Sequence, residues 1–248
     1  MTVIDKSLPV LVTGANGYVA SWLVKYLLED GFNVRATVRD KTNAKKVSHL
    51  NKLSEEHAGK LELFNADLFN TGDFDVPMNG CELVFHTASP FIVKGLNDPQ
   101  KELIEPALNG TRNVLNSANK TTSVKRVVLT SSVVAIYSDN VETLQQPNGT
   151  FSESVWNTSS SIDNQPYNYS KTLAEKEAWK IAEEQDRWDL VVMNPGLVLG
   201  PSLAQASDST SLSTMLEIMD GTMRTGAPDM RFPILDVRDV ALAHIKGA

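Results

Sequence analysis

The sequence has one cysteine, four histidines and no long apolar run, and each shortage excludes a class of protein. Cys81 has no partner for an internal disulfide, which fits a reducing compartment, so we expect a cytoplasmic protein. The scattered histidines offer no metal-ligand spacing, and no metal site is expected. No window approaches the roughly eighteen apolar residues that cross a bilayer, and the N-terminus lacks the pattern of a secretion signal. We therefore expect no membrane contact.

Basic residues are also in the minority, with a net charge of -7 over 248 residues. A nucleic-acid partner is not expected, because its phosphates require a basic face. The composition is 42% hydrophobic and 21% charged, which is typical of a globular protein able to bury a large core. We expect a monomer or homodimer that acts on a small molecule.

Short apolar runs alternate with helical patterns through most of the chain. Strands are expected at 10–13, 33–39, 61–64, 82–86, 126–130 and 189–193, with helices that include 43–56, 100–119 and 167–184. This alternation predicts an α/β fold, a doubly wound and mostly parallel Rossmann sheet. After Gly196 the alternation stops, until a last helix near 238–246. We therefore expect a dinucleotide-binding domain at 1–195 and the start of a smaller substrate-binding lobe at 196–248.

A turn rich in small residues joins the first strand to the first helix. Gly14, Gly17 and Ala20 stand in a G-x-x-G-x-x-A spacing. Small residues permit a sharp bend and a close approach of a pyrophosphate, which binds the free N–H groups of the helix. The spacing departs from the commonest G-x-G-x-x-G pattern, and in isolation it could mark a plain tight turn. Its place between strand and helix favours dinucleotide binding.

The end of the second strand is positively charged. Six basic residues stand between 35 and 52 (positions 35, 39, 41, 45, 46 and 52), against one acidic residue, Asp40. An acidic residue at this place binds the ribose 2′-hydroxyl of NAD, whereas arginine and lysine suit the 2′-phosphate of NADP. The charge predicts NADPH. A solvated helix face is the alternative, and Asp40 leaves use of both cofactors open.

The stretch QPYNYSKTLAEK at 165–176 places two tyrosines before one lysine. Residues four apart share a helix face and residues two apart do not, so Lys171 can serve Tyr167 and not Tyr169. A nearby cation lowers a tyrosine pKa from about 10, which would prepare Tyr167 to protonate a carbonyl. Tyr169 is expected to pack. Ser132, at the end of the fifth strand, is the candidate hydroxyl that holds the carbonyl oxygen.

Taken in order, these segments resemble the extended short-chain dehydrogenase/reductases, in the branch of dihydroflavonol, cinnamoyl-CoA and methylglyoxal reductases. The segments are LVTGANGYVASWLVKYLLEDGFNVRATVRD, VFHTASPF, GTRNVL, VKRVVLTSS, YNYSKTLAEKEAW, NPGLVLGP and DVRDVALAHI. The resemblance implies NADPH-dependent reduction of an aldehyde or ketone, with Ser132, Tyr167 and Lys171 as the catalytic residues. Cofactor contacts are expected at Gly14, Asn16, Gly17, Tyr18, Val19, Arg39, Lys46, Asp67, Leu68, Thr87 and Pro195, besides Tyr167 and Lys171.

Other interpretations stay open at this point. Asp67 could accept from adenine or cap its own turn, and His86 is expected to pack within the sheet. Members of the family continue past DVRDVALAHI, so the substrate lobe is expected to be incomplete here. The alternatives to a reductase are a nucleotide-sugar epimerase or dehydratase and a non-catalytic NADPH sensor. The basic second strand disfavours the first, and the intact catalytic residues disfavour the second. The substrate is not identified, and its pocket is expected from 90–95, 133–165 and 197–233.

Overall fold

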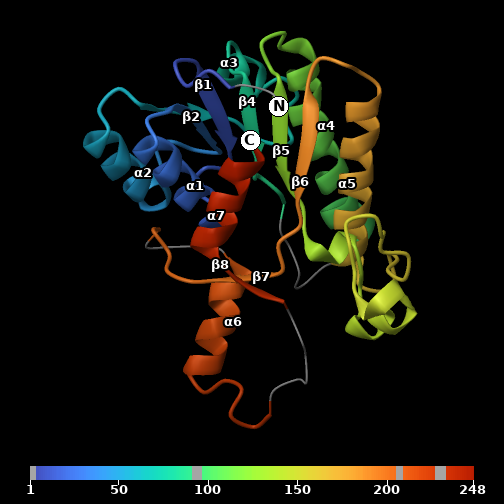
Figure 1. Ribbon diagram of the computed structural model, residues 1–248. Coiled ribbons are helices and arrows are strands. Elements are labelled where there is room, and N and C mark those ends of the chain that lie inside the picture. Colours follow the sequence, from blue (N-terminus) through green and yellow to red (C-terminus); the bar gives the residue numbers. More distant parts are fainter. Residues whose placement is uncertain (1–3, 91–96, 205–208, 227–232) are drawn as a thin grey trace.

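A six-stranded parallel sheet forms the centre of the computed structural model, which describes residues 4–90, 97–204, 209–226 and 233–248 (Figure 1). The strand order is β3-β2-β1-β4-β5-β6, so the winding reverses between β1 and β4. This confirms the predicted doubly wound fold. The strands are β1 (Pro9–Thr13), β2 (Asn33–Val38), β3 (Leu61–Asn65), β4 (Leu83–His86), β5 (Arg126–Thr130) and β6 (Asp189–Met193).

Helices cover both faces of the sheet (Figure 1). On one face lie α1 (Tyr18–Glu29), α2 (Ala44–Glu56) and α7 (Val237–Gly247), and on the other lie α3 (Asp75–Met78), α4 (Glu105–Lys120) and α5 (Pro166–Glu183). The predicted helix at 100–119 begins as a π-helical turn, Gln100–Ile104, that continues into α4. Each face of the sheet therefore has its own apolar core.

The residues of β1 show how one strand supplies two cores. Val10 and Val12 pack in the core beneath α1 and α2, whereas Leu11 packs in the core beneath α4 and α5. Successive side chains of a strand point to opposite faces. Because helices cover both faces of the sheet, all three side chains are buried. A strand covered on both faces therefore has an uninterrupted apolar sequence, which is what made it recognisable. Cys81 is likewise a buried core residue.

The chain after β6 leaves the sheet and then returns to it. Two short strands, β7 (Leu197–Leu199) and β8 (Ile234–Asp236), pair in parallel, and α6 (Thr210–Met219) projects from them (Figure 1). None of these elements was predicted. For β7 and β8 the reason is their length, because three-residue strands carry no readable period. The chain then packs α7 beside α1 on the main sheet. Helix α7 belongs to the predicted second domain but packs in the core of the first. The division into 1–195 and 196–248 stays a prediction.

Two polar contacts fasten the last helix and the chain that follows β7. His244 on α7 is buried and pairs through Nε2 with Thr130 Oγ1 at 2.7 Å, at the end of β5. Trp22 Nε1 on α1 donates to the carbonyl of Pro201 at 2.8 Å. In the described part of the chain, no helix is both long and apolar enough to cross a bilayer.

Phe85, in the centre of the sheet, provides a test of this core. Its side chain is 0% exposed, whereas that of Phe69 is 59% exposed. Phe85→Ala is expected to lower the free energy of unfolding by about 3–5 kcal/mol, through lost burial and a cavity. Phe69→Ala is the matched control, with a change within about 0.5 kcal/mol. Denaturant unfolding measures both, and equal losses would contradict the described core.

Candidate active site

The glycine turn after β1 has a shape that only small residues permit. Gly14 has φ +62, and a Cβ on it would lie 3.0 Å from Ala88 Cα. Gly17 is the N-cap of α1 and supplies no side-chain cap, and the first turn of α1 has no acidic residue. The N–H groups of that turn are therefore available to an anion, and their helix dipole favours it. These features fit the pyrophosphate of a dinucleotide.

Two of the predicted cofactor contacts next to this turn have side chains engaged elsewhere. The Tyr18 hydroxyl donates to the Gly200 carbonyl at 2.6 Å, and its ring packs with Val198 and Val237. Val19 packs against the same cluster. The expected contacts at Tyr18 and Val19 stay predictions, and with these side chains engaged the contacts would be made by main-chain N–H groups at the start of α1. Asn16 lies half-buried within the turn.

Three members of the predicted basic group have partners of their own. Arg35 donates to the carbonyls of Pro77 and Asn79, Lys41 Nζ donates to the Leu63 carbonyl at 3.4 Å, and Lys52 pairs with Glu56 at 3.8 Å. The six basic residues of this stretch are therefore not all directed to one place, since Arg35 lies within β2 and Lys52 lies in the later part of α2. Arg39, Lys45 and Lys46 lie near the strand end, between the end of β2 and the first turn of α2.

Arg39 is exposed at the end of β2, and Lys46 lies half-buried in the first turn of α2. The neighbouring carboxylate of Asp40 is already bound. Its Oδ1 accepts from Thr42 N at 2.8 Å and from Thr42 Oγ1 at 2.6 Å, and these bonds lower the pKa of Asp40. Asp40 therefore holds its own turn, which weakens the case for an NAD ribose contact at this position.

The predicted residues at the ends of β3 and β4 lie in the same edge of the sheet. Asp67 Oδ1 accepts from Phe69 N at 3.0 Å, so this carboxylate caps its own turn. Thr87 donates to the Thr13 carbonyl. His86 is buried and pairs through Nδ1 with Thr13 Oγ1 at 3.0 Å, and burial lowers the pKa of His86 to about 3. The expectation that His86 packs within the sheet is confirmed.

Helix α5 carries Tyr167 in its first turn and Lys171 one turn later. Ser132 follows β5 and caps a 3₁₀ turn. The Ser132 hydroxyl lies close enough to the Tyr167 phenol to oppose the rise in its pKa, and Lys171 Nζ lies 6.0 Å from the centroid of the Tyr167 ring. The Ser132 hydroxyl also lies 3.5 Å from the Pro195 carbonyl. The structure thus brings the three predicted catalytic residues together at the ligand-binding edge of the sheet.

Burial dominates the electrostatics of this group. It raises the pKa of Tyr167, and the hydrogen bond with Ser132 opposes that shift. Burial also lowers the pKa of Lys171 to about 8, with the charge of Glu175 opposing. Lys171 was expected to lower the pKa of Tyr167, but burial and Ser132 are the influences on this phenol in the protein alone. The ammonium instead donates to Ser89 Oγ at 2.8 Å, over the ring of Tyr167 and not at its hydroxyl.

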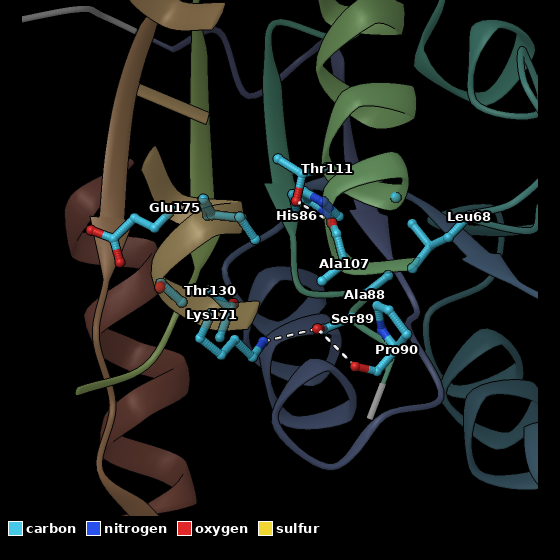
Figure 2. Close-up of a pocket in the computed structure, with 14 residues that line it drawn as sticks. Leu68, His86, Ala88, Ser89, Pro90, Ala107, Thr111, Thr130, Lys171 and Glu175 are labelled. Atoms are coloured by element: carbon cyan, nitrogen blue, oxygen red, sulfur yellow. Dashed lines mark hydrogen bonds between the residues drawn. The ribbon is translucent and has the colours of Figure 1, made fainter. Parts of the chain in front are cut away.

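A small cavity lies behind Lys171 (Figure 2). Its volume of about 20 Å³ is enough for one water molecule. The lining includes the cofactor candidate Leu68 together with Ser131, Lys171 and Glu175, and Ser131 Oγ is buried there with no hydrogen-bond partner. No cluster of three or more His, Cys, Asp or Glu side chains in the described ranges could hold a metal. Positions 91–95, 205–208 and 227–232 of the expected substrate pocket lie outside the described residues.

Sequence reasoning missed three residues that contact this group: Ser89, Glu175 and Asn194. Glu175 Oε2 accepts from Asn194 Nδ2 at 2.7 Å. Its spacing of four from Lys171 was a readable signal, since both then lie on one helix face. Nothing in the local sequence marks Ser89 or Asn194 as partners, because both reach α5 from other elements.

Comparisons with known proteins agree on one family. A family model described as the NAD dependent epimerase/dehydratase family matches residues 10–247. Cinnamoyl-CoA reductase CAD2 of Medicago truncatula is 47% identical over 240 residues, covering 95% of this chain and 71% of that protein. An anthocyanidin reductase of Vitis vinifera is 40% identical, covering 94% of this chain and 70% of that protein.

Solved structures of reductases share the fold. Yeast methylglyoxal/isovaleraldehyde reductase Gre2, complexed with NADPH, superposes with a TM-score of 0.77 at 30% identity. Gre2 from Candida albicans in complex with NADPH gives 0.76 at 32% identity. Each match covers 96% of this chain and 73% of the other.

Buried His86 makes stability sensitive to acid. The pKa of His86 lies below the usual 6.5. Between about pH 6.5 and 3, this histidine is therefore protonated in the unfolded chain and neutral in the folded chain. Stability should therefore fall as pH drops through that window, by about 1.4 kcal/mol per pH unit from this group. In His86→Asn, whose amide can still bond Thr13, the slope should be shallower by that amount.

His57→Gln is the matched control, because His57 lies half-exposed at the end of α2. Denaturant unfolding at a series of pH values measures the slope. An unchanged slope in His86→Asn would show that this imidazole accepts its proton without cost to the fold.

Proposed function

The chain belongs to the NAD dependent epimerase/dehydratase family, in the reductase branch of the extended short-chain dehydrogenase/reductases, and we propose that it reduces an aldehyde or ketone with NADPH. The observation that carries the proposal is that the hydroxyls of Tyr167 and Ser132 come together beside the buried Lys171. The relatives named above are reductases, which favours this reaction over epimerisation. The same site in a purely regulatory protein would need neither an acid nor a desolvated cation.

The chain's own residues divide the proton chemistry among them. Ser132 would hold the carbonyl oxygen, and Tyr167 would donate its phenolic proton to that oxygen as charge develops there. Because burial disfavours a phenolate, the remaining charge needs the Ser132 hydroxyl and the Lys171 ammonium nearby. The phenolate then recovers a proton from solvent. NADPH, when bound, supplies the hydride.

Cofactor binding would use the edge of the sheet between β1 and β2. The glycine turn and the first N–H groups of α1 would hold the pyrophosphate, and Arg39 with Lys46 would hold a 2′-phosphate. Lys171 would exchange its bond to Ser89 for the ribose hydroxyls of the nicotinamide half. Asp67, Leu68, Thr87 and Pro195 would line the path between, on the ends of β3, β4 and β6.

Tyr167→Phe tests the acid. We expect reduction to fall by about 10²-fold or more, because phenylalanine has no proton to donate, while NADPH binding stays near normal. Tyr169→Phe is the matched control, since Tyr169 lies two residues before Lys171 on another face of the helix, and it should keep most of its activity. NADPH absorbance and cofactor titration give the two readouts. Near-normal turnover in Tyr167→Phe would refute the assignment.

Arg39→Ala tests the cofactor preference. Loss of a charged hydrogen bond to the 2′-phosphate should raise the KM for NADPH by about 10-fold and leave that for NADH almost unchanged. Lys52→Ala is the control, because Lys52 pairs with Glu56 away from the strand end. A preference for NADH in the wild-type protein would overturn the assignment of NADPH.

A substrate panel should follow the names of the relatives: cinnamoyl-CoA, an anthocyanidin, methylglyoxal and isovaleraldehyde. Consumption of NADPH in proportion to product is the result expected of a reductase. Turnover of a nucleotide sugar with no net cofactor oxidation would instead indicate an epimerase. Cofactor binding with no turnover of any compound would favour a sensor.

A further inference from the structure

Glu175 is a buried carboxylate at the centre of the candidate site, and the reaction outlined above assigns it no part. It is 7% exposed and lies on α5 one turn after Lys171 and two turns after Tyr167. Its Oε2 accepts from Asn194 Nδ2 at 2.7 Å. The same Nδ2 donates to the main-chain carbonyl of Ser132 at 3.2 Å. One carboxylate therefore connects the helix of two catalytic residues to the strand end of the third.

Asn194 is well placed to transmit this contact, because it directly follows β6 beside the end of β5. Ser131 N donates to the Met193 carbonyl at 2.8 Å, and Val133 N donates to the Pro195 carbonyl at 3.0 Å. These bonds continue the pairing of the two strand ends on both sides of Ser132. A group that holds Asn194 thus also sets the distance between Ser132 and α5.

The charge of Glu175 also needs a partner, because a buried carboxylate without one is costly. Lys171 is the cation one turn away on the same helix, and both residues line the cavity behind the site. Figure 2 shows their charged ends pointing in different directions, the ammonium toward Ser89, so the two charges interact across the site and not as a direct ion pair. The other titratable groups near Lys171 are Tyr167, on its own helix, and His86 on β4, both uncharged. On α7, His244 faces the cavity residue Thr130, and burial lowers the pKa of His244. On α4, Arg112 is paired with Glu177 at 2.7 Å.

We propose that Glu175 is a positioning residue for the reduction: it is the counter-charge that keeps Lys171 protonated, and through Asn194 it holds Ser132 in place. The reductase part of this inference rests on the proposed function. The direction of the electrostatics agrees with it, since burial lowers the pKa of Lys171 and the charge of Glu175 opposes that shift. Both roles follow from one side chain joined to two elements.

Glu175→Gln separates the charge from the contact, because the amide oxygen can still accept from Asn194. The basic limb of the kcat/KM profile should move to lower pH by about 1 unit or more, with rates approaching wild type at acidic pH. Glu177→Gln, which removes a charge from another face of the same helix, where Glu177 pairs with Arg112 of α4, should leave the limb in place. Asn194→Ala should lower kcat at every pH without moving the limb. An unmoved limb in Glu175→Gln would overturn the proposal.

A second measurement does not depend on any activity. Melting temperatures are compared for wild type, Glu175→Gln, Lys171→Met and the double variant. If the two charges are partners, Glu175→Gln should lower the melting temperature when Lys171 is present and leave it unchanged or raise it when Lys171 is Met. Additive effects would overturn the pairing. If no carbonyl compound is reduced, the proposed function is wrong. The melting temperatures of the four proteins still decide whether Glu175 and Lys171 interact.

Discussion

The site depends on the burial of an ammonium group against the end of a parallel sheet. Lys171 is 9% exposed, so its charge has lost most of its water and depends on a few protein groups. That loss also strengthens the interaction of the charge with nearby protein groups such as Glu175, because little solvent screens it. Helix α5 must therefore seat firmly on the ends of β5 and β6, and the polar contacts there are close and numerous.

The winding of the sheet explains why residues so distant in sequence meet. Parallel strands present all their carboxyl ends at one edge, and the reversal between β1 and β4 opens a crevice there. The glycine turn, the basic residues after β2 and the hydroxyls after β5 all belong to that edge. Family membership and the reductase relatives agree with this arrangement, and the chain spans 71% of the length of the Medicago relative.

The main sheet could be predicted almost strand by strand, because β1, β4 and β5 are short, mainly apolar runs and β2 alternates apolar with polar residues. The helix spacing of Tyr167 and Lys171 was equally readable. Three things were not. β7 and β8 are too short to show a period, and the bond of Tyr18 to Gly200 joins residues 182 positions apart. The acidity of Tyr167 depends on exclusion of solvent, which spacing does not reveal. Arg35 was misplaced for a related reason, since its partners lie on another element.

The return of α7 to the main sheet has a consequence for adaptation. The chain between Gly200 and Val237 is fastened at both ends, by Tyr18 and Trp22 on α1 at its start and by the packing of α7 at its finish. Its middle can therefore vary in sequence and length at a small entropic penalty, while the nucleotide-binding framework stays intact. Under the proposed function, exchange of this one segment would let the same core accept different carbonyl compounds.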